Sequence, residues 1–205
     1  MTFPHTKKPL PAAKAGLRKL IEGNERFMRG QAHFPTVCKE TLADLARGQH
    51  PYATIIGCSD SRVPPELIFD ADFGELFIVR VAGNVISPEV MGSLQYAGAH
   101  LHTLLFVVLG HEGCGAVQAA LEFKYHRAKQ RSRIQILVEN MLPGLSDFDR
   151  RLPKDTLLAD AVEANVRWSM HQLMETPESK KAMKKGAQLV GAIYEIASGR
   201  VRFLS

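Results

Sequence analysis

The residues with the clearest chemical potential form two short clusters, Cys58-Ser59-Asp60-Ser61-Arg62 and His111-Glu112-Gly113-Cys114. Two cysteines and one histidine supply three of the four ligands of a tetrahedral zinc ion, and a catalytic zinc site keeps its fourth position open. A purely structural zinc site needs neither a carboxylate nor an arginine beside its first cysteine. The two clusters therefore predict a zinc site built for chemistry, with Cys58, His111 and Cys114 as ligands.

Asp60 can play two roles beside such an ion. Its carboxylate can take the fourth zinc position and close the site, or it can pair with Arg62 and accept a hydrogen bond from a zinc-bound hydroxide. Arg62 favours the second state because a guanidinium group offers a carboxylate two parallel hydrogen bonds. We therefore predict that Asp60 and Arg62 decide together whether the metal is open to substrate.

The charge of the ligands predicts the pH range of activity. Two thiolates and a neutral imidazole cancel the charge of zinc, whereas three histidines leave it in full and give a bound water with a pKa of about 7. Water bound to the predicted site should be the weaker acid. We expect activity to rise through the mildly alkaline range.

Each motif has a simpler explanation when it is taken alone. A Cys-x-Asp sequence is often a buried thiol followed by a turn, and His-x-x-Cys occurs by chance. Zinc that only stabilises the fold is the alternative for the two motifs together. The third cysteine, Cys38, is expected to be a packed thiol and not a ligand.

Composition excludes several classes of partner. The chain has 205 residues, 45% of them apolar and 23% charged, which is typical of a globular protein. The net charge of +5 is spread along the chain, so we expect no nucleic-acid partner. The longest apolar run, residues 104–109, is too short to span a membrane, and no signal peptide is visible. An odd number of cysteines does not suit a disulfide framework, so we expect a cytoplasmic protein.

Predicted strands and helices alternate along most of the chain. Mostly apolar runs predict strands at residues 53–57, 76–81, 104–109 and 188–196, and residues 200–204 are expected to pair back with the last of these after a hairpin turn. Helical patterns cover residues 14–29, 41–46, 88–102, 114–123, 157–175 and 178–185. This order predicts an α/β fold with a mainly parallel sheet of about four strands, an antiparallel edge strand and helices on both faces. We assign residues 1–40 to an N-terminal arm and helix, with a loose arm at 1–13, and residues 41–205 to a single catalytic domain.

Strand order decides whether the two clusters form one site. Both follow a predicted strand, and ligands of open α/β sheets gather at the carboxyl ends of the strands. Cys58 and the second cluster converge if the strand at 104–109 lies beside the strand at 53–57, with the strand at 76–81 on the other side. We expect that order.

The sequence resembles the β-class carbonic anhydrase family. Residues 58–64 and 110–115 match the two signatures of that family at its usual separation. The resemblance covers residues 14–122 well, and residues 191–204 look like the family's final hairpin. Residues 123–156 match weakly.

The resemblance implies a zinc lyase that hydrates carbon dioxide reversibly to bicarbonate and a proton through a zinc-bound hydroxide. It implies one Zn2+ per chain on Cys58, His111 and Cys114, with Asp60 and Arg62 as the gate. Two alternatives stay open beside it. One is a hydrolase of another small linear substrate, carbon disulfide or carbonyl sulfide, and the other is a non-catalytic zinc-stabilised binding protein. An intact Asp60–Arg62 pair argues against the latter.

The resemblance also implies a substrate site shared between subunits. Gln49 is expected to hydrogen-bond substrate across a subunit interface, and Phe77 and Ala82 to line an apolar pocket for carbon dioxide. Gly115 completes the predicted substrate-binding residues. The expected assembly is a homodimer or a dimer of dimers, in which the helix at 14–29 covers part of the partner.

One departure concerns regulation. A subgroup of the family that is regulated by bicarbonate has a tryptophan where this chain has Ile55. Val63, Arg80 and Tyr96 match the other positions of that subgroup. Because the tryptophan is missing, we do not expect bicarbonate regulation through that pocket.

Overall fold

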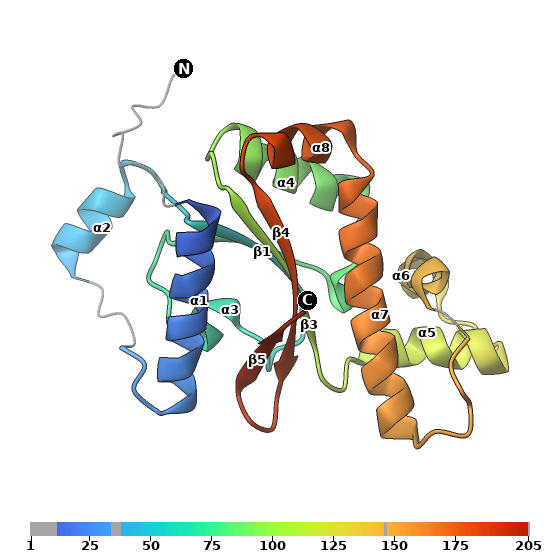
Figure 1. The fold of residues 1–205 in the computed structure, drawn as a ribbon. Helices are drawn as coiled ribbons and strands as arrows, with labels where there is room; N and C mark the ends of the chain where they lie inside the picture. The colour runs from blue at the N-terminus through green and yellow to red at the C-terminus, as the bar shows by residue number, and fades with distance from the viewer. Residues whose placement is uncertain (1–11, 34–37, 146, 205) are drawn as a thin grey trace.

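In the computed structural model of the protein, a five-stranded sheet runs through the centre and helices pack on both of its faces (Figure 1). The strand order is β2-β1-β3-β4-β5. Neighbouring strands are parallel except for β5, which pairs antiparallel with β4 at one edge. The structure describes residues 12–33, 38–145 and 147–204. Both the predicted fold class and the predicted strand order are confirmed.

The strands are β1 (Ala53–Gly57), β2 (Leu76–Arg80), β3 (Leu105–His111), β4 (Gln188–Glu195) and β5 (Arg200–Phe203). The helices are α1 (Ala13–Met28), α2 (Lys39–Leu45), α3 (Pro65–Ile68), α4 (Pro88–Ala99), α5 (Gly115–His126), α6 (Ser132–Met141), α7 (Lys154–Met174) and α8 (Pro177–Lys184), with 3-10 turns η1 (Ala82–Asn84) and η2 (Leu142–Gly144). The sequence did not predict α3 and α6. Helix α4 ends earlier than predicted, because the chain turns through a left-handed residue at His102 (φ 58°). The loose arm predicted for residues 1–13 lies outside the described residues, apart from its last two.

Helix α1 covers one face of the sheet, with α3 beside it (Figure 1). Alternate side chains of β1 and β3 point to this face, and Ile55, Val107 and Leu109 pack there in one cluster with Leu20 of α1. At Gly23 an added Cβ would overlap the backbone carbonyl of Phe69. Helix α1 therefore contacts the chain beneath it directly.

A buried carboxylate fixes the end of α1. The Asp70 side chain is only 2% exposed and accepts hydrogen bonds from Arg26 Nε at 2.5 Å and from the backbone N–H of His33 at 2.7 Å. Burial raises the pKa of the Asp70 carboxyl, but these hydrogen bonds outweigh it and the net shift is downward. Asp70 therefore stays ionised and joins α1 to the chain that follows α3.

Helices α4, α5, α6 and α7 cover the opposite face (Figure 1). Ile56, Val108 and Ile193 point to this side and form the second core cluster. Helix α7 approaches β3 very closely at Gly110, where an added Cβ would lie 2.5 Å from Val166 Cγ2. This close approach brings α7 near the carboxyl end of β3, where the second sequence cluster begins.

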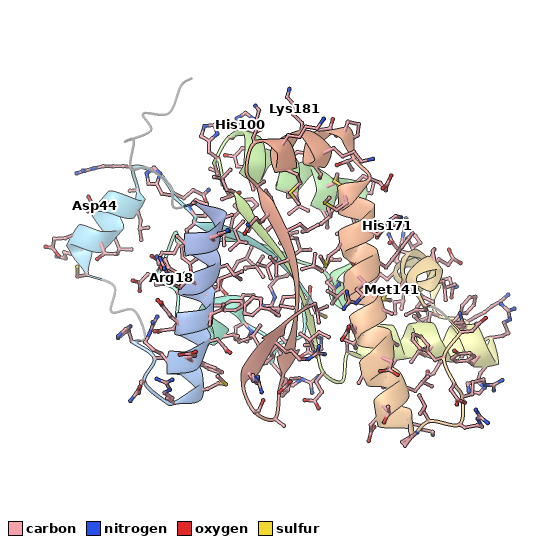
Figure 2. All side chains as sticks on the ribbon, viewed as in Figure 1. Arg18, Asp44, His100, Met141, His171 and Lys181 are labelled. Atoms are coloured by element: carbon pink, nitrogen blue, oxygen red, sulfur yellow. The ribbon has the colours of Figure 1, made fainter. Side chains whose placement is uncertain are left out.

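A cavity of about 440 Å³ lies at the other end of the sheet, between α4, the last turn of α7, and α8. It is lined mostly by apolar side chains, Met91 and Leu94 of α4 and Leu173 of α7 among them. His100 and Lys181, both labelled in Figure 2, lie at this end of the molecule. No helix in the described part of the chain is long and apolar enough to cross a membrane.

Candidate metal centre

The three predicted ligands come together at the carboxyl ends of β1 and β3. Cys58 directly follows β1, His111 is the last residue of β3, and Cys114 is the residue before α5. Their ligand atoms all lie within 4.8 Å of one another, and the three residues are buried. Two adjacent parallel strands end at the same edge of the sheet, so the pairing of β1 with β3 places the clusters side by side.

The arrangement fits a tetrahedral metal ion. The Cys58 and Cys114 sulfurs are 4.0 Å apart, close to the spacing of about 3.8 Å that two Zn–S bonds at a tetrahedral angle give. His111 Nδ1 donates to the Glu112 carbonyl at 2.9 Å, which leaves the lone pair on Nε2. His111 Nε2 is buried and has no hydrogen-bond partner among the described residues. A buried polar atom is costly without a partner, and a metal ion would supply one.

The two sulfurs affect each other's ionisation. The pKa of the Cys58 thiol lies well below its ordinary value, first because Cys114 donates to its sulfur and further because of His111 and the Gly83 N–H. The pKa of Cys114 is raised by the same sulfur–sulfur interaction and by burial. One thiolate beside one thiol is the expected behaviour of two adjacent sulfurs. A divalent cation favours both as thiolates.

Asp60 and Arg62 form a bidentate pair beside the ligands. Asp60 Oδ1 accepts from Arg62 Nε at 2.9 Å and Oδ2 accepts from Nη2 at 2.7 Å. These hydrogen bonds hold the pKa of the Asp60 carboxyl far below its usual range. Asp60 Oδ2 also lies 3.9 Å from His111 Nε2, so the carboxylate borders the ligand set while both its oxygens are bound by Arg62.

Arg80 holds the loop that carries Cys58 and Asp60, a role that the sequence analysis did not predict. Its Nε donates to the Cys58 carbonyl at 2.9 Å and its Nη2 to the Asp60 carbonyl at 2.6 Å. Arg80 ends β2 directly opposite Gly57 of β1, so strand register places its side chain beside the loop. The sequence did hold one signal for this role, because Arg80 is a basic residue at the end of a strand that was expected to lie beside the strand before Cys58.

The η1 turn supplies a hydrogen bond to one of the sulfurs. Gly83 N–H donates to Cys58 Sγ at 3.3 Å, and Gly83 has a left-handed backbone with φ of 69°. Ala82, predicted to line the substrate pocket, is the half-buried residue before it. Gly115, the other small residue predicted there, begins α5 beside Cys114 and is exposed, with open space around its Cα.

The structure does not bring Gln49 or Phe77 to the ligands of the same chain. Phe77 pairs with Thr54, four residues before Cys58; at about 3.3 Å per residue the two positions are about 13 Å apart along the strands. Gln49 is exposed and precedes β1, farther still from its carboxyl end. Both residues therefore lie toward the amino ends of the strands.

One expectation about a single residue needs correction. Cys38 is exposed and not packed, because it precedes α2, a helix with no buried residue. Glu112 contacts the predicted ligand His111 through its backbone, since its carbonyl accepts the His111 hydrogen bond. The Glu112 side chain points elsewhere and accepts from the backbone N–H of Ile196 at 3.1 Å.

The chain matches known proteins over most of its length. The model of the carbonic anhydrase family matches residues 53–201. Carbonic anhydrase 2 of Mycobacterium tuberculosis is 44% identical over 97% of this chain and 93% of its own length. Carbonic anhydrase of Mycolicibacterium smegmatis is 37% identical over 93% of each chain.

Solved structures agree. The β-carbonic anhydrase CcaA has a TM-score of 0.73 and 28% identity, covering 93% of this chain and 88% of its own. The β-carbonic anhydrase CafA of Aspergillus fumigatus also has a TM-score of 0.73, with 29% identity over 94% of this chain and 90% of its own. The site and these similarities lead to one conclusion: the chain belongs to the carbonic anhydrase family, and within it to the β class.

Proposed function

We propose that this carbonic anhydrase converts carbon dioxide and water reversibly to bicarbonate and a proton with one zinc ion held by Cys58, His111 and Cys114. The observation that carries the metal assignment is the buried, unpartnered His111 Nε2 beside two sulfurs that are 4.0 Å apart. Zinc bound there would lower the pKa of a water ligand and so supply a hydroxide nucleophile in the mildly alkaline range.

Asp60 orients the attacking oxygen in this proposal. Its carboxylate is ionised at working pH and can only accept hydrogen bonds. It borders the ligand set, 3.9 Å from His111 Nε2. An oxygen that donates its hydrogen to Asp60 directs its lone pair away from the carboxylate, toward the substrate. Asp60 therefore contributes orientation and not proton removal.

Arg62 keeps Asp60 available for that task. Both oxygens of Asp60 are engaged by Arg62, and the backbone N–H of Arg62 donates to Oδ1 at 3.0 Å as well. Without these bonds the carboxylate would be a competing ligand for a metal at the site, as the possible fourth ligand of a closed state. The pair thus acts as the gate, with Asp60 and Arg62 as its two members.

Substrate contacts come from two directions in this proposal. Ala82 and Gly115 border the ligands of their own chain. Gln49 and Phe77 lie about 13 Å or more away along β1 and β2, so they serve the site of a second subunit. The free edge of β2 supports such an assembly, since β2 pairs with no strand but β1 in the described part of the chain and its residues are half-exposed.

Exposed apolar side chains near that edge favour a homodimer or a dimer of dimers. The Tyr96 ring lies tilted against the Phe77 ring, with ring centroids 6.1 Å apart, and Tyr96 is 46% exposed. Phe73, in the loop that leads into β2, is 58% exposed. Large exposed aromatic side chains beside an unpaired strand edge are typical of a subunit interface.

We further propose a cytoplasmic location. Cys38, Cys58 and Cys114 are all free thiols. Metal ligands must stay reduced to bind, and the exposed Cys38 would be open to oxidation in an oxidising compartment.

A pair of cysteine variants tests the proposal. Cys114→Ala removes a ligand, so zinc should fall from about one per chain to near zero and hydration of carbon dioxide to the uncatalysed rate. Cys38→Ala removes an exposed thiol and should change neither. The measurements are elemental analysis and a stopped-flow hydration assay on purified protein. Full zinc retention by Cys114→Ala, or a wild-type protein without hydration activity, would refute the assignment.

A further inference from the structure

We propose that Asn165 and Ser169 of α7 are positioning residues for the metal centre. They hold the η1 turn in place so that the Gly83 N–H stays directed at the Cys58 sulfur. The inference rests on the proposed metal binding by Cys58, and it adds to that proposal two residues that touch neither the metal ligands nor the substrate.

The η1 turn cannot hold its conformation without support. Gly83 and Asn84 both have left-handed backbones, with φ of 69° and 43°. For Asn84, which is not glycine, this conformation costs free energy and persists only where surrounding contacts impose it. Space is tight as well, since a Cβ on Gly83 would lie 2.9 Å from Met141 Sδ. Met141, labelled in Figure 2, lies close to α7 at the end of α6.

Helix α7 supplies the support through two side chains one turn apart. Asn165 Nδ2 donates to the Gly83 carbonyl at 2.8 Å. Ser169 Oγ donates to the Asn84 carbonyl at 3.0 Å, and Asn84 Nδ2 donates to Ser169 Oγ at 3.3 Å. Residues four apart lie on the same face of a helix, so both side chains can hydrogen-bond to the η1 turn. These bonds hold the Gly83 and Asn84 carbonyls, which follow the Gly83 N–H in the chain, and so fix the direction of that N–H.

The polar groups between α7 and η1 are buried. Asn84, Asn165 and Ser169 are each only 1% exposed and lie within an otherwise apolar core. Asn165 Oδ1 has no hydrogen-bond partner among the described residues, which is unfavourable for a buried polar atom. The bond from Asn165 to the Gly83 carbonyl offsets that cost, and an apolar side chain at this position would leave the carbonyl without this partner. The amide is therefore placed where it holds Gly83.

The consequence reaches the metal through one hydrogen bond. An N–H that donates to a thiolate withdraws charge from the sulfur and fixes its direction, as partners of metal ligands generally do. The contact from Gly83 N to Cys58 Sγ is 3.3 Å, within hydrogen-bond reach of sulfur, so its length and direction follow the position of η1. Asn165 and Ser169 thus set how strongly Cys58 donates to the metal.

Cobalt-substituted protein provides the test. In Co(II)-loaded protein, Asn165→Leu and Ser169→Ala should move the thiolate-to-cobalt absorption band to lower energy, since the sulfur loses a hydrogen bond. Competition with a chelator should show zinc affinity about tenfold lower. Ser169→Thr keeps the hydroxyl and should retain wild-type values.

Trp168→Phe is the matched control. It also removes a bond from α7 to a backbone carbonyl, Trp168 Nε1 to Asn140 at 2.9 Å, but that bond does not reach η1. The Trp168→Phe variant should leave the energy of the thiolate-to-cobalt band and the affinity for zinc unchanged. Folded Asn165→Leu and Ser169→Ala proteins with wild-type band and affinity would overturn the inference, as would equal changes in Trp168→Phe. A wild-type protein with no thiolate band would instead overturn the metal site itself.

Discussion

The two ends of the parallel sheet differ in how they use space and polarity. The amino ends of β3 and β4 border the cavity of about 440 Å³, which is lined mostly by apolar side chains. The carboxyl ends of β1 and β3 hold buried sulfurs, a buried imidazole and an ionised carboxylate in fixed contact. The proposed reaction belongs to the second region, although this cavity lies in the first. Polar atoms held in place, and not the size of a cavity, mark the site.

The sharpest way to test this difference is at the carboxyl end. Asp60→Asn keeps the shape of the side chain but removes its charge, so kcat/KM for hydration should fall about 100-fold or more while zinc stays bound. Arg62→Lys keeps the charge and loses the two-pronged contact, so a smaller loss is expected. Stopped-flow kinetics and zinc analysis measure both. An Asp60→Asn protein with wild-type kcat/KM would contradict the role assigned to the pair.

Mixed subunits test whether the amino end of one chain serves the carboxyl end of another. Gln49→Ala and Asp60→Asn proteins should each be inactive. If Gln49 acts across an interface, every mixed dimer has one intact site, and random exchange should restore about a quarter of wild-type activity. Light scattering and labelled subunits establish the exchange. Proven exchange without recovered activity would mean that Gln49 and Asp60 act within one chain, and it would refute sharing.

A buried carboxylate outside the metal site should affect stability and not rate. Asp70→Asn should lower the free energy of unfolding by about 2 kcal/mol at pH 7, with kcat/KM unchanged. The pKa of Asp70 is lower in the folded protein than its unfolded value of about 3.9, so its contribution is complete above that value and is lost as pH falls through the folded pKa.

Urea unfolding of wild type and variant at pH 7 and at about pH 3 checks this sign. The difference between the two proteins should shrink at the lower pH. An equal difference at both pH values would show that Asp70 acts through packing and not through its charge.

The smallest effect is expected at the amino-end cavity. Ala182 of α8 lines it, and Ala182→Leu would fill part of the space. The free energy of unfolding should change by no more than about 1 kcal/mol and kcat/KM should not change. A clear loss of kcat/KM in this variant would break the comparison, since it would link the cavity to the reaction.

Most of the fold follows from local pattern, and the exceptions have physical reasons. All strands were predicted to within two residues at each end, because β1 to β4 are mostly apolar and β5 follows a hairpin turn. Helix α6 was missed because Ile134 and Ile136, which are 48% and 53% exposed, blur the apolar spacing that leads to the buried Val138 and Met141. Cys38 was misjudged because a cysteine is usually buried, whereas neither Cys38 nor any residue of α2 is buried among the residues that the structure describes.

The grouping of Cys58, His111 and Cys114 was also predictable, since their residue types and spacing are specific. The residues that hold the surrounding turn and loop in place were not predictable. Asn165 binds Gly83 across 82 positions of the chain, and Ser169 binds Asn84 across 85. Nothing in the local sequence of α7 distinguishes these residues from surface polar residues. Arg80 gave a partial signal, as a basic residue at a strand end, but its two carbonyl acceptors depend on strand register.

The sulfurs of the metal centre lie 56 residues apart in the chain, and the excursion between them contains β2 and α4. An ion that joins Cys58 to Cys114 is therefore a crosslink as well as a reagent. By chain entropy, closing a loop of that length disfavours the unfolded ensemble by about 4 kcal/mol. Reactivity and resistance to unfolding would then rise and fall together with the supply of a single ion.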